Sequence, residues 1–170
     1  MNNGYCHRFG KNIGGIKQIL LTPVCNIKSA STDPVSGHFH SLLLHEPAKL
    51  AECSFAENAI RYREETDNRN GVPSIVHSLE FHTDKIDGES DRFIRMLVEA
   101  SQSGLAAVIT TQNNIRLVVG YSEEHGTERP LRLQQVIADT GNKPADNGHE
   151  AISLISRDTA KARILDGKIS

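Results

Sequence analysis

The stretch that decides the fold is SDRFIRMLVEASQSGLAAVITTQNNIRLVVGY, residues 90–121. Its first half places five side chains on one helical face: Phe93, Ile94, Leu97, Val98 and Ser101. Ser90 is expected to be the N-cap, and Gly104 should end the helix at the C′ position. Its second half predicts two strands, because two apolar runs flank the turn at 112–114. The pattern predicts one helix that packs on a sheet.

The pattern of most of the remaining chain predicts short strands separated by turns. The expected strands are 16–24, 38–45, 53–63, 72–82, 131–138 and 149–155, with a loop at 29–37. A strand–helix–strand order occurs only once, which argues against a doubly wound α/β fold. We therefore expect a mainly β protein, a β-sandwich or barrel, with one flanking α-helix at about residues 90–103. Residues 1–15 should form an N-terminal arm, and residues 16–165 a single domain.

An extended hairpin is predicted at about residues 55–82. Its return strand alternates, with Ile75, His77, Leu79 and Phe81 on one side. The turn before it, Thr66–Gly71, is polar and ends in Asn-Gly. Because an isolated two-stranded ribbon is only marginally stable, we expect a neighbouring subunit to bury Ile75, Leu79 or Phe81.

The length, charge and cysteine content of the chain argue against several classes of protein. The chain has 170 residues, which is enough for one domain. Its formal net charge is −2, so it lacks the excess of basic residues that is typical of nucleic-acid-binding proteins. Its apolar runs reach only four or five residues, as in Leu105–Ile109, whereas a membrane span needs about 20. No secretory signal is visible at the N-terminus. The three cysteines are widely spaced, which argues against a disulfide framework or zinc knuckle and fits a reducing compartment.

The sharpest catalytic candidate is the segment His38-Phe39-His40. Histidines at i and i+2 of a strand point the same way and can share a metal, with a third ligand from His45, His77 or His82. The segment superficially resembles the cupin metal motif, but Glu46 lies one position too far along and the flanking glycines are missing. Surface strand residues are the favoured interpretation. Nucleophile and nucleotide motifs are also absent from the sequence, so we expect no enzyme, no cofactor and no catalytic or metal residues.

Seven segments, most of them in the second half of the chain, follow one another in a distinctive order: 13–21 (IGGIKQILL), 79–81 (LEF), 106–109 (AAVI), 115–120 (IRLVVG), 130–133 (PLRL), 139–141 (DTG) and 146–152 (DNGHEAI). This order resembles that of the tail tube proteins of tailed bacteriophages and, more distantly, of type VI secretion tube proteins. The resemblance covers most of residues 13–160 and lies in the order of elements.

The resemblance implies a virion structural protein, made in the bacterial host cytoplasm and located in the tail. Such subunits form hexameric rings that stack into a tube for passive passage of DNA, with no membrane and no catalytic residues. Residues 55–82 and 1–15 would contact adjacent copies, and other tail or connector proteins would be partners. A head–tail connector, a tail terminator, a monomeric β domain and a cupin-like metal enzyme using His38 and His40 remain alternatives.

Overall fold

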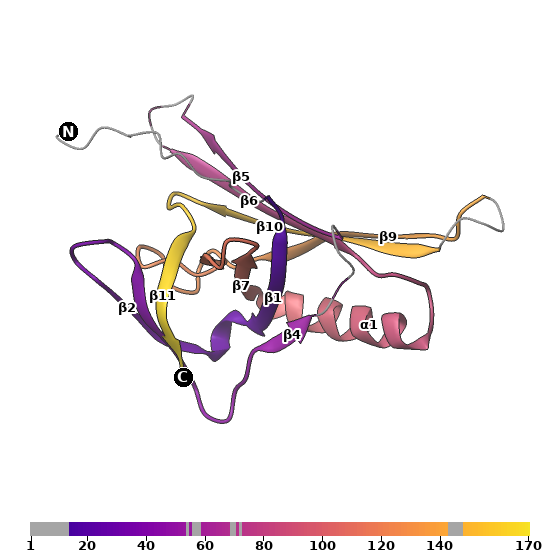
Figure 1. Cartoon of the computed structure of the whole chain (residues 1–170), viewed down its shortest axis with the longest axis horizontal. Coiled ribbons are helices and arrows are strands. Elements are labelled where there is room, and N and C mark those ends of the chain that lie inside the picture. Colours follow the sequence, from indigo (N-terminus) through magenta and orange to yellow (C-terminus); the bar gives the residue numbers. More distant parts are fainter. Residues whose placement is uncertain (1–13, 54, 56–58, 69–70, 72, 143–147) are drawn as a thin grey trace.

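The computed structural model describes residues 14–53, 55, 59–68, 71, 73–142 and 148–170 (Figure 1). Most of the arm expected at residues 1–15 therefore lies outside the described residues. The strands are β1 (Ile16–Pro23), β2 (Ile27–Thr32), β3 (Phe39–Leu44), β4 (Ala51–Cys53), β5 (Ile60–Asp67), β6 (Ser74–His82), β7 (Leu105–Thr111), β8 (Arg116–Val119), β9 (Arg132–Asp139), β10 (His149–Asp158) and β11 (Arg163–Ile169). A short 3-10 turn (Val24–Asn26) joins β1 to β2, and the helix α1 spans Gly88–Ser103.

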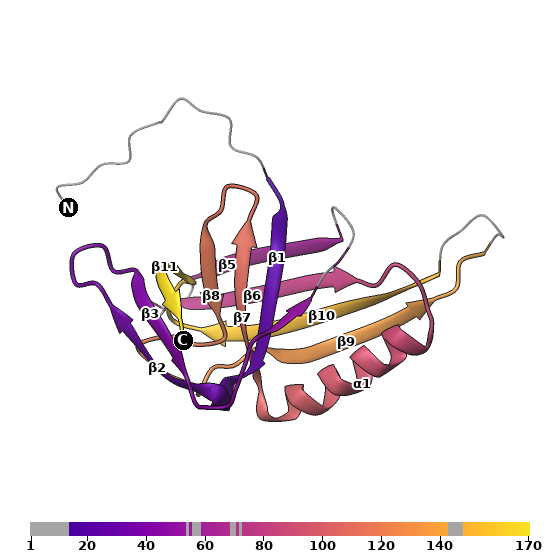
Figure 2. The same cartoon turned by 60° about the horizontal axis from the view of Figure 1, so that its bottom comes forward.

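The strands form two sheets, which confirms the predicted mainly β fold with one helix. A seven-stranded sheet has the order β2-β3-β11-β8-β7-β1-β4, and a four-stranded sheet has the order β5-β6-β10-β9. Figure 2 shows the four long strands of the second sheet side by side, with α1 running beside β9. Among the described residues, every strand pairing is antiparallel except the parallel pair β3–β11.

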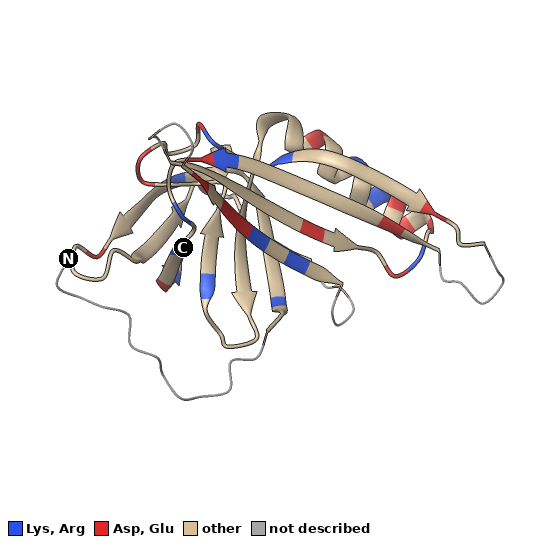
Figure 3. Ribbon diagram, turned by 90° about the horizontal axis from the view of Figure 1, so that it is seen from above, with Lys and Arg blue, Asp and Glu red and all other residues tan. Residues whose placement is uncertain are grey.

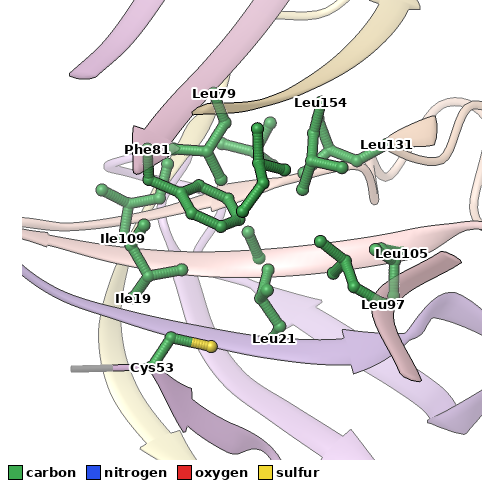
Figure 4. Packing of buried hydrophobic residues seen from close by; sticks show 13 residues of the cluster. Ile19, Leu21, Cys53, Leu79, Phe81, Leu97, Leu105, Ile109, Leu131 and Leu154 are labelled. Atoms are coloured by element: carbon green, nitrogen blue, oxygen red, sulfur yellow. The ribbon is translucent and has the colours of Figure 1, made fainter. Parts of the chain in front are cut away.

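The main core lies between the two sheets, as Figure 4 shows. Ile19 and Ile109 reach it from the seven-stranded sheet, and Leu79 and Leu154 reach it from the four-stranded sheet. A second cluster, which includes Phe39, packs on the opposite face of the seven-stranded sheet. Since β7 contributes to both clusters, it is buried on both faces, which explains its continuous apolar sequence.

The helix begins earlier than predicted because Asp87, not Ser90, is its N-cap. The Asp87 carboxylate accepts hydrogen bonds from the backbone N–H groups of Glu89 and Ser90, both at 3.0 Å. Ser90 completes a capping box, since its Oγ accepts a hydrogen bond from the Asp87 N–H at 3.0 Å. Gly104 ends the helix as predicted, with a φ of +88°, and Pro130 packs so closely that a Cβ at Gly104 would meet it at 2.4 Å.

The alternation predicted for β6 is confirmed, but the partner predicted to bury it is wrong. Ile75, Leu79 and Phe81 are at most 3% exposed within this chain's own core. They are buried because β6 is an internal strand, paired with β5 on one side and β10 on the other. The hairpin of β5 and β6 is therefore part of the sandwich and not a free ribbon.

Three other strands depart from the sequence prediction. Residues 27–32, mostly expected as loop, form β2, an edge strand held by β3. The strand β11 was not predicted and runs to Ile169, past the expected domain end at 165. The strand β4 was expected to continue into the hairpin, but it pairs with β1 in the other sheet.

Candidate functional site

The histidines of the candidate metal motif, His38 and His40, flank the buried Phe39 on β3. His38 is engaged by an acidic partner, because its Nδ1 lies 2.6 Å from Asp166 Oδ2 on β11. His40 is exposed, and Glu46 is exposed beyond the end of the strand. Among the residues that the structure describes, no group of three or more His, Cys, Asp or Glu side chains is placed to hold a metal ion. His77 and His82, two of the candidate third ligands, belong to β6 in the other sheet.

Beside His38, the guanidinium of Arg163 joins two loops. Its Nη2 lies 2.8 Å from Glu124 Oε1 and 3.1 Å from Glu123 Oε2, and its Nη1 donates to the carbonyl of Gly37 at 2.9 Å. The same group lies over the ring of Phe39, 5.8 Å from the centroid. All of these contacts are internal to the chain, so the cluster acts as a clamp that fixes β11 to the loops around it.

A buried polar network lies where β5 and β6 meet the turn between β10 and β11. His77, whose side chain is 4% exposed, has Nε2 3.1 Å from the carbonyl of Ala160 and Nδ1 2.8 Å from Tyr62 Oη. The Glu64 carboxylate accepts the backbone N–H of Ala162 at 3.0 Å and lies 3.6 Å from His77 Nδ1. Burial and the neighbouring Glu64 raise the pKa of the Tyr62 phenol well above its usual range. These bonds tie β5 and β6 to the turn between β10 and β11, so the network's role is structural.

The outer face of the four-stranded sheet turns away from the core and is polar. Alternation along each strand places on this face Arg61, Arg63, Glu65 and Asp67 of β5, Val76, Ser78, Glu80 and His82 of β6, Arg132, Gln135, Ile137 and Asp139 of β9, and Ala151, Ser153, Ile155 and Arg157 of β10. Figure 3 looks onto this sheet and shows basic and acidic residues mixed along it. A hollow of about 440 Å³ lies on the face, lined by Arg61, Glu80, His82, Gln135 and Ala151 among others.

The edges of this sheet are the other exposed feature. In the described part of the chain, β5 and β9 each pair with one neighbour only, so each is an edge strand. Both are eight residues long. The helix packs near β9 on the core side, through Leu97. Long edge strands carry unpaired backbone N–H and C=O groups, which are ready to pair with another strand.

The sequence predicted the placement of some of these residues but not their partners. The predicted alternation in 72–82 correctly put His77 on the buried side, but nothing in the sequence identified Tyr62 and Glu64 as its partners. Arg163 was not predicted as a clamp, because β11 itself was not predicted. Its acidic partners, Glu123 and Glu124, lie in the loop that follows β8.

Comparisons with known proteins add no relative. No family model, no curated protein and no solved structure matches this chain. No helix among the described residues is long and apolar enough to cross a membrane.

Proposed function

We propose that this chain is a structural protein that assembles with copies of itself, specifically a tail tube subunit of a tailed phage. Its rings, hexameric by resemblance to that family, stack in the virion tail into a tube through which DNA passes, and they meet other tail or connector proteins at the tube ends. The observation that carries the proposal is the four-stranded sheet whose two edge strands, β5 and β9, have equal length and each pair with one neighbouring strand in the described part of the chain.

Strand direction favours edge-to-edge joining of identical copies. The order β5-β6-β10-β9 is antiparallel throughout, so β5 and β9 run in opposite directions. When copies are related by rotation about an axis roughly along the strands, β9 of one copy meets β5 of the next in the antiparallel sense. A head-to-tail contact of this kind generates a closed ring if the rotation closes. An even number of strands per copy therefore supports a continuous antiparallel sheet around the ring.

The charges along the two edges are complementary in that orientation. On the outer face, β5 begins with Arg61 and Arg63 and ends with Asp67, whereas β9 begins with Arg132 and ends with Asp139. Antiparallel pairing brings the start of β5 to the end of β9. Basic side chains then lie near Asp139 at one end, and Asp67 lies near Arg132 at the other. Opposite charges on paired strands stabilise the pair, and like charges destabilise it.

The polar outer face supports passage of DNA without binding. Arg61, Arg63, Arg132 and Arg157 are offset on the same face by Glu65, Asp67, Glu80 and Asp139. Tight binding to the phosphate backbone requires clustered Lys and Arg, because it is driven by neutralisation of phosphates and release of counterions. A face with both signs mixed lets DNA slide past.

The test is a charge swap across the proposed joint, read by negative-stain microscopy and light scattering. Arg61→Glu and Asp139→Lys should each weaken ring formation because each places like charges at the joint, and the double variant should restore it. Arg157→Glu is the matched control, since it makes the same change on the same face but on the internal strand β10. Far-UV circular dichroism verifies that every variant is folded.

The outcomes separate the alternatives. Stacked rings or tubes that respond to the swap as expected support the tube subunit, and single rings that never stack favour a terminator or connector. A strict monomer at every concentration overturns the proposal. Assembly that is equally sensitive to Arg157→Glu overturns the β5–β9 joint.

A further inference from the structure

Two histidines, His82 and His149, lie side by side on the outer face of the four-stranded sheet. His82 ends β6, and His149 begins the neighbouring strand β10. The strand register pairs His82 with Ala151, so His149 is its diagonal neighbour on the same face. The two rings approach closely, with centroids 5.7 Å apart and planes at 69°.

This spacing suits a shared metal ion. A zinc ion binds each imidazole nitrogen at about 2.0–2.1 Å in tetrahedral geometry, which places the centroids of two bound rings roughly 5 Å apart. The observed 5.7 Å is close to that value. The second torsion angle of histidine is broad, so aiming one nitrogen of each ring at a common point needs no backbone movement. His149 makes a further interaction in this structure, and an imidazole that binds a metal through one nitrogen can keep a partner on the other. Both strands are held in the sheet by neighbours, which fixes the Cα positions.

The surroundings of the two histidines favour a bound cation, because they are open to solvent and carry negative charge. His82 is exposed and lines the hollow on this face. Asp139 lies directly opposite His149 on β9, on the same face of the sheet, so it contributes negative charge nearby. One of its carboxylate oxygens accepts the backbone N–H of Gly141 at 2.8 Å, which orients the group.

From these observations we propose that His82 and His149 form a two-histidine site for a divalent first-row metal ion such as Zn²⁺, with water completing the coordination. The site is independent of assembly, because both ligands come from one chain. It is distinct from the His38–His40 segment, which lies at the start of β3 in the other sheet.

Isothermal titration of Zn²⁺ into the full chain, without an affinity tag and near pH 7.5, tests the site. The expected result is one Zn²⁺ per chain at this site, with affinity reduced at least tenfold by either His82→Ala or His149→Ala. The double variant should lose little further affinity beyond either single variant, since the chelate is lost with its first ligand. His40→Ala is the matched control, an exposed strand histidine whose loss should leave the affinity unchanged.

A second readout reports the ligands directly. Electron spin echo measurements on bound Cu²⁺, in a Cys25→Ser background that removes an exposed thiol, should detect two imidazoles in the parent and at most one in each variant. A parent signal from a single imidazole, or equal Zn²⁺ affinity in His82→Ala and His40→Ala, overturns the proposal. The assembly-deficient Arg61→Glu chain should still bind Zn²⁺, so failure of the ring model leaves this result standing.

Discussion

Replacing Leu79 by Ala should lower the free energy of unfolding by about 3–5 kcal/mol. Leu79 is fully buried on the internal strand β6, with Leu154 of β10 on one side and Tyr62 of β5 on the other. Large-to-small changes cost about 2–5 kcal/mol, and the cost rises with the cavity left behind. A side chain between two hydrogen-bonded neighbours leaves a cavity that cannot collapse, which puts this site in the upper part of the range.

The assay is urea denaturation followed by far-UV circular dichroism, with Val76→Ala as the matched control. Val76 lies on the outer face of the same strand and is only partly buried, so its truncation should cost below about 1 kcal/mol. Because assembly adds stability that depends on concentration, both measurements belong in the Arg61→Glu background at low concentration. If Leu79→Ala costs no more than Val76→Ala, this chain's own core does not depend on β6, and burial by a neighbouring subunit would be the better explanation.

The remaining predictions concern a thiol and a helix cap. Burial raises the pKa of Cys53 to about 11, whereas Cys25 is exposed, so iodoacetamide at pH 8 should alkylate Cys25 and spare Cys53 in peptide mapping by mass spectrometry. Equal labelling of both in the folded protein would contradict the burial of Cys53. The ion pair with Lys85 and the backbone bonds of the cap lower the pKa of Asp87. The Asp87 carboxylate therefore makes its full contribution to the free energy of unfolding above about pH 3.9, the pKa of an aspartate in the unfolded chain. That contribution is lost as the pH falls through the lower pKa that Asp87 has in the folded protein. The difference in melting temperature between the parent and Asp87→Ala should be constant from pH 5 to 7 and shrink below pH 3; a difference that stays constant at low pH would show that the charge of Asp87 is irrelevant.

Local pattern alone determined much of this molecule. The alternation in β6 assigned Ile75, His77, Leu79 and Phe81 to one side, and all four are buried. Helical spacing predicted α1 to within a few residues, and Gly104 ended it as expected. Period and turn chemistry report how each segment faces its surroundings, and this information is carried by adjacent residues.

Only the tertiary structure decided which strands pair and which side chains meet. The strand β11 has a glycine in its interior and joins β3 in parallel, with a register shift, across more than a hundred residues of chain. Gly167 is required there because a Cβ would overlap the backbone of His40. Likewise, the approach of His82 to His149 and the position of β5 and β9 as edge strands follow from the order of strands within the sheet. That order depends on the packing of distant segments against a shared core, a non-local balance that periodicity along the chain does not encode.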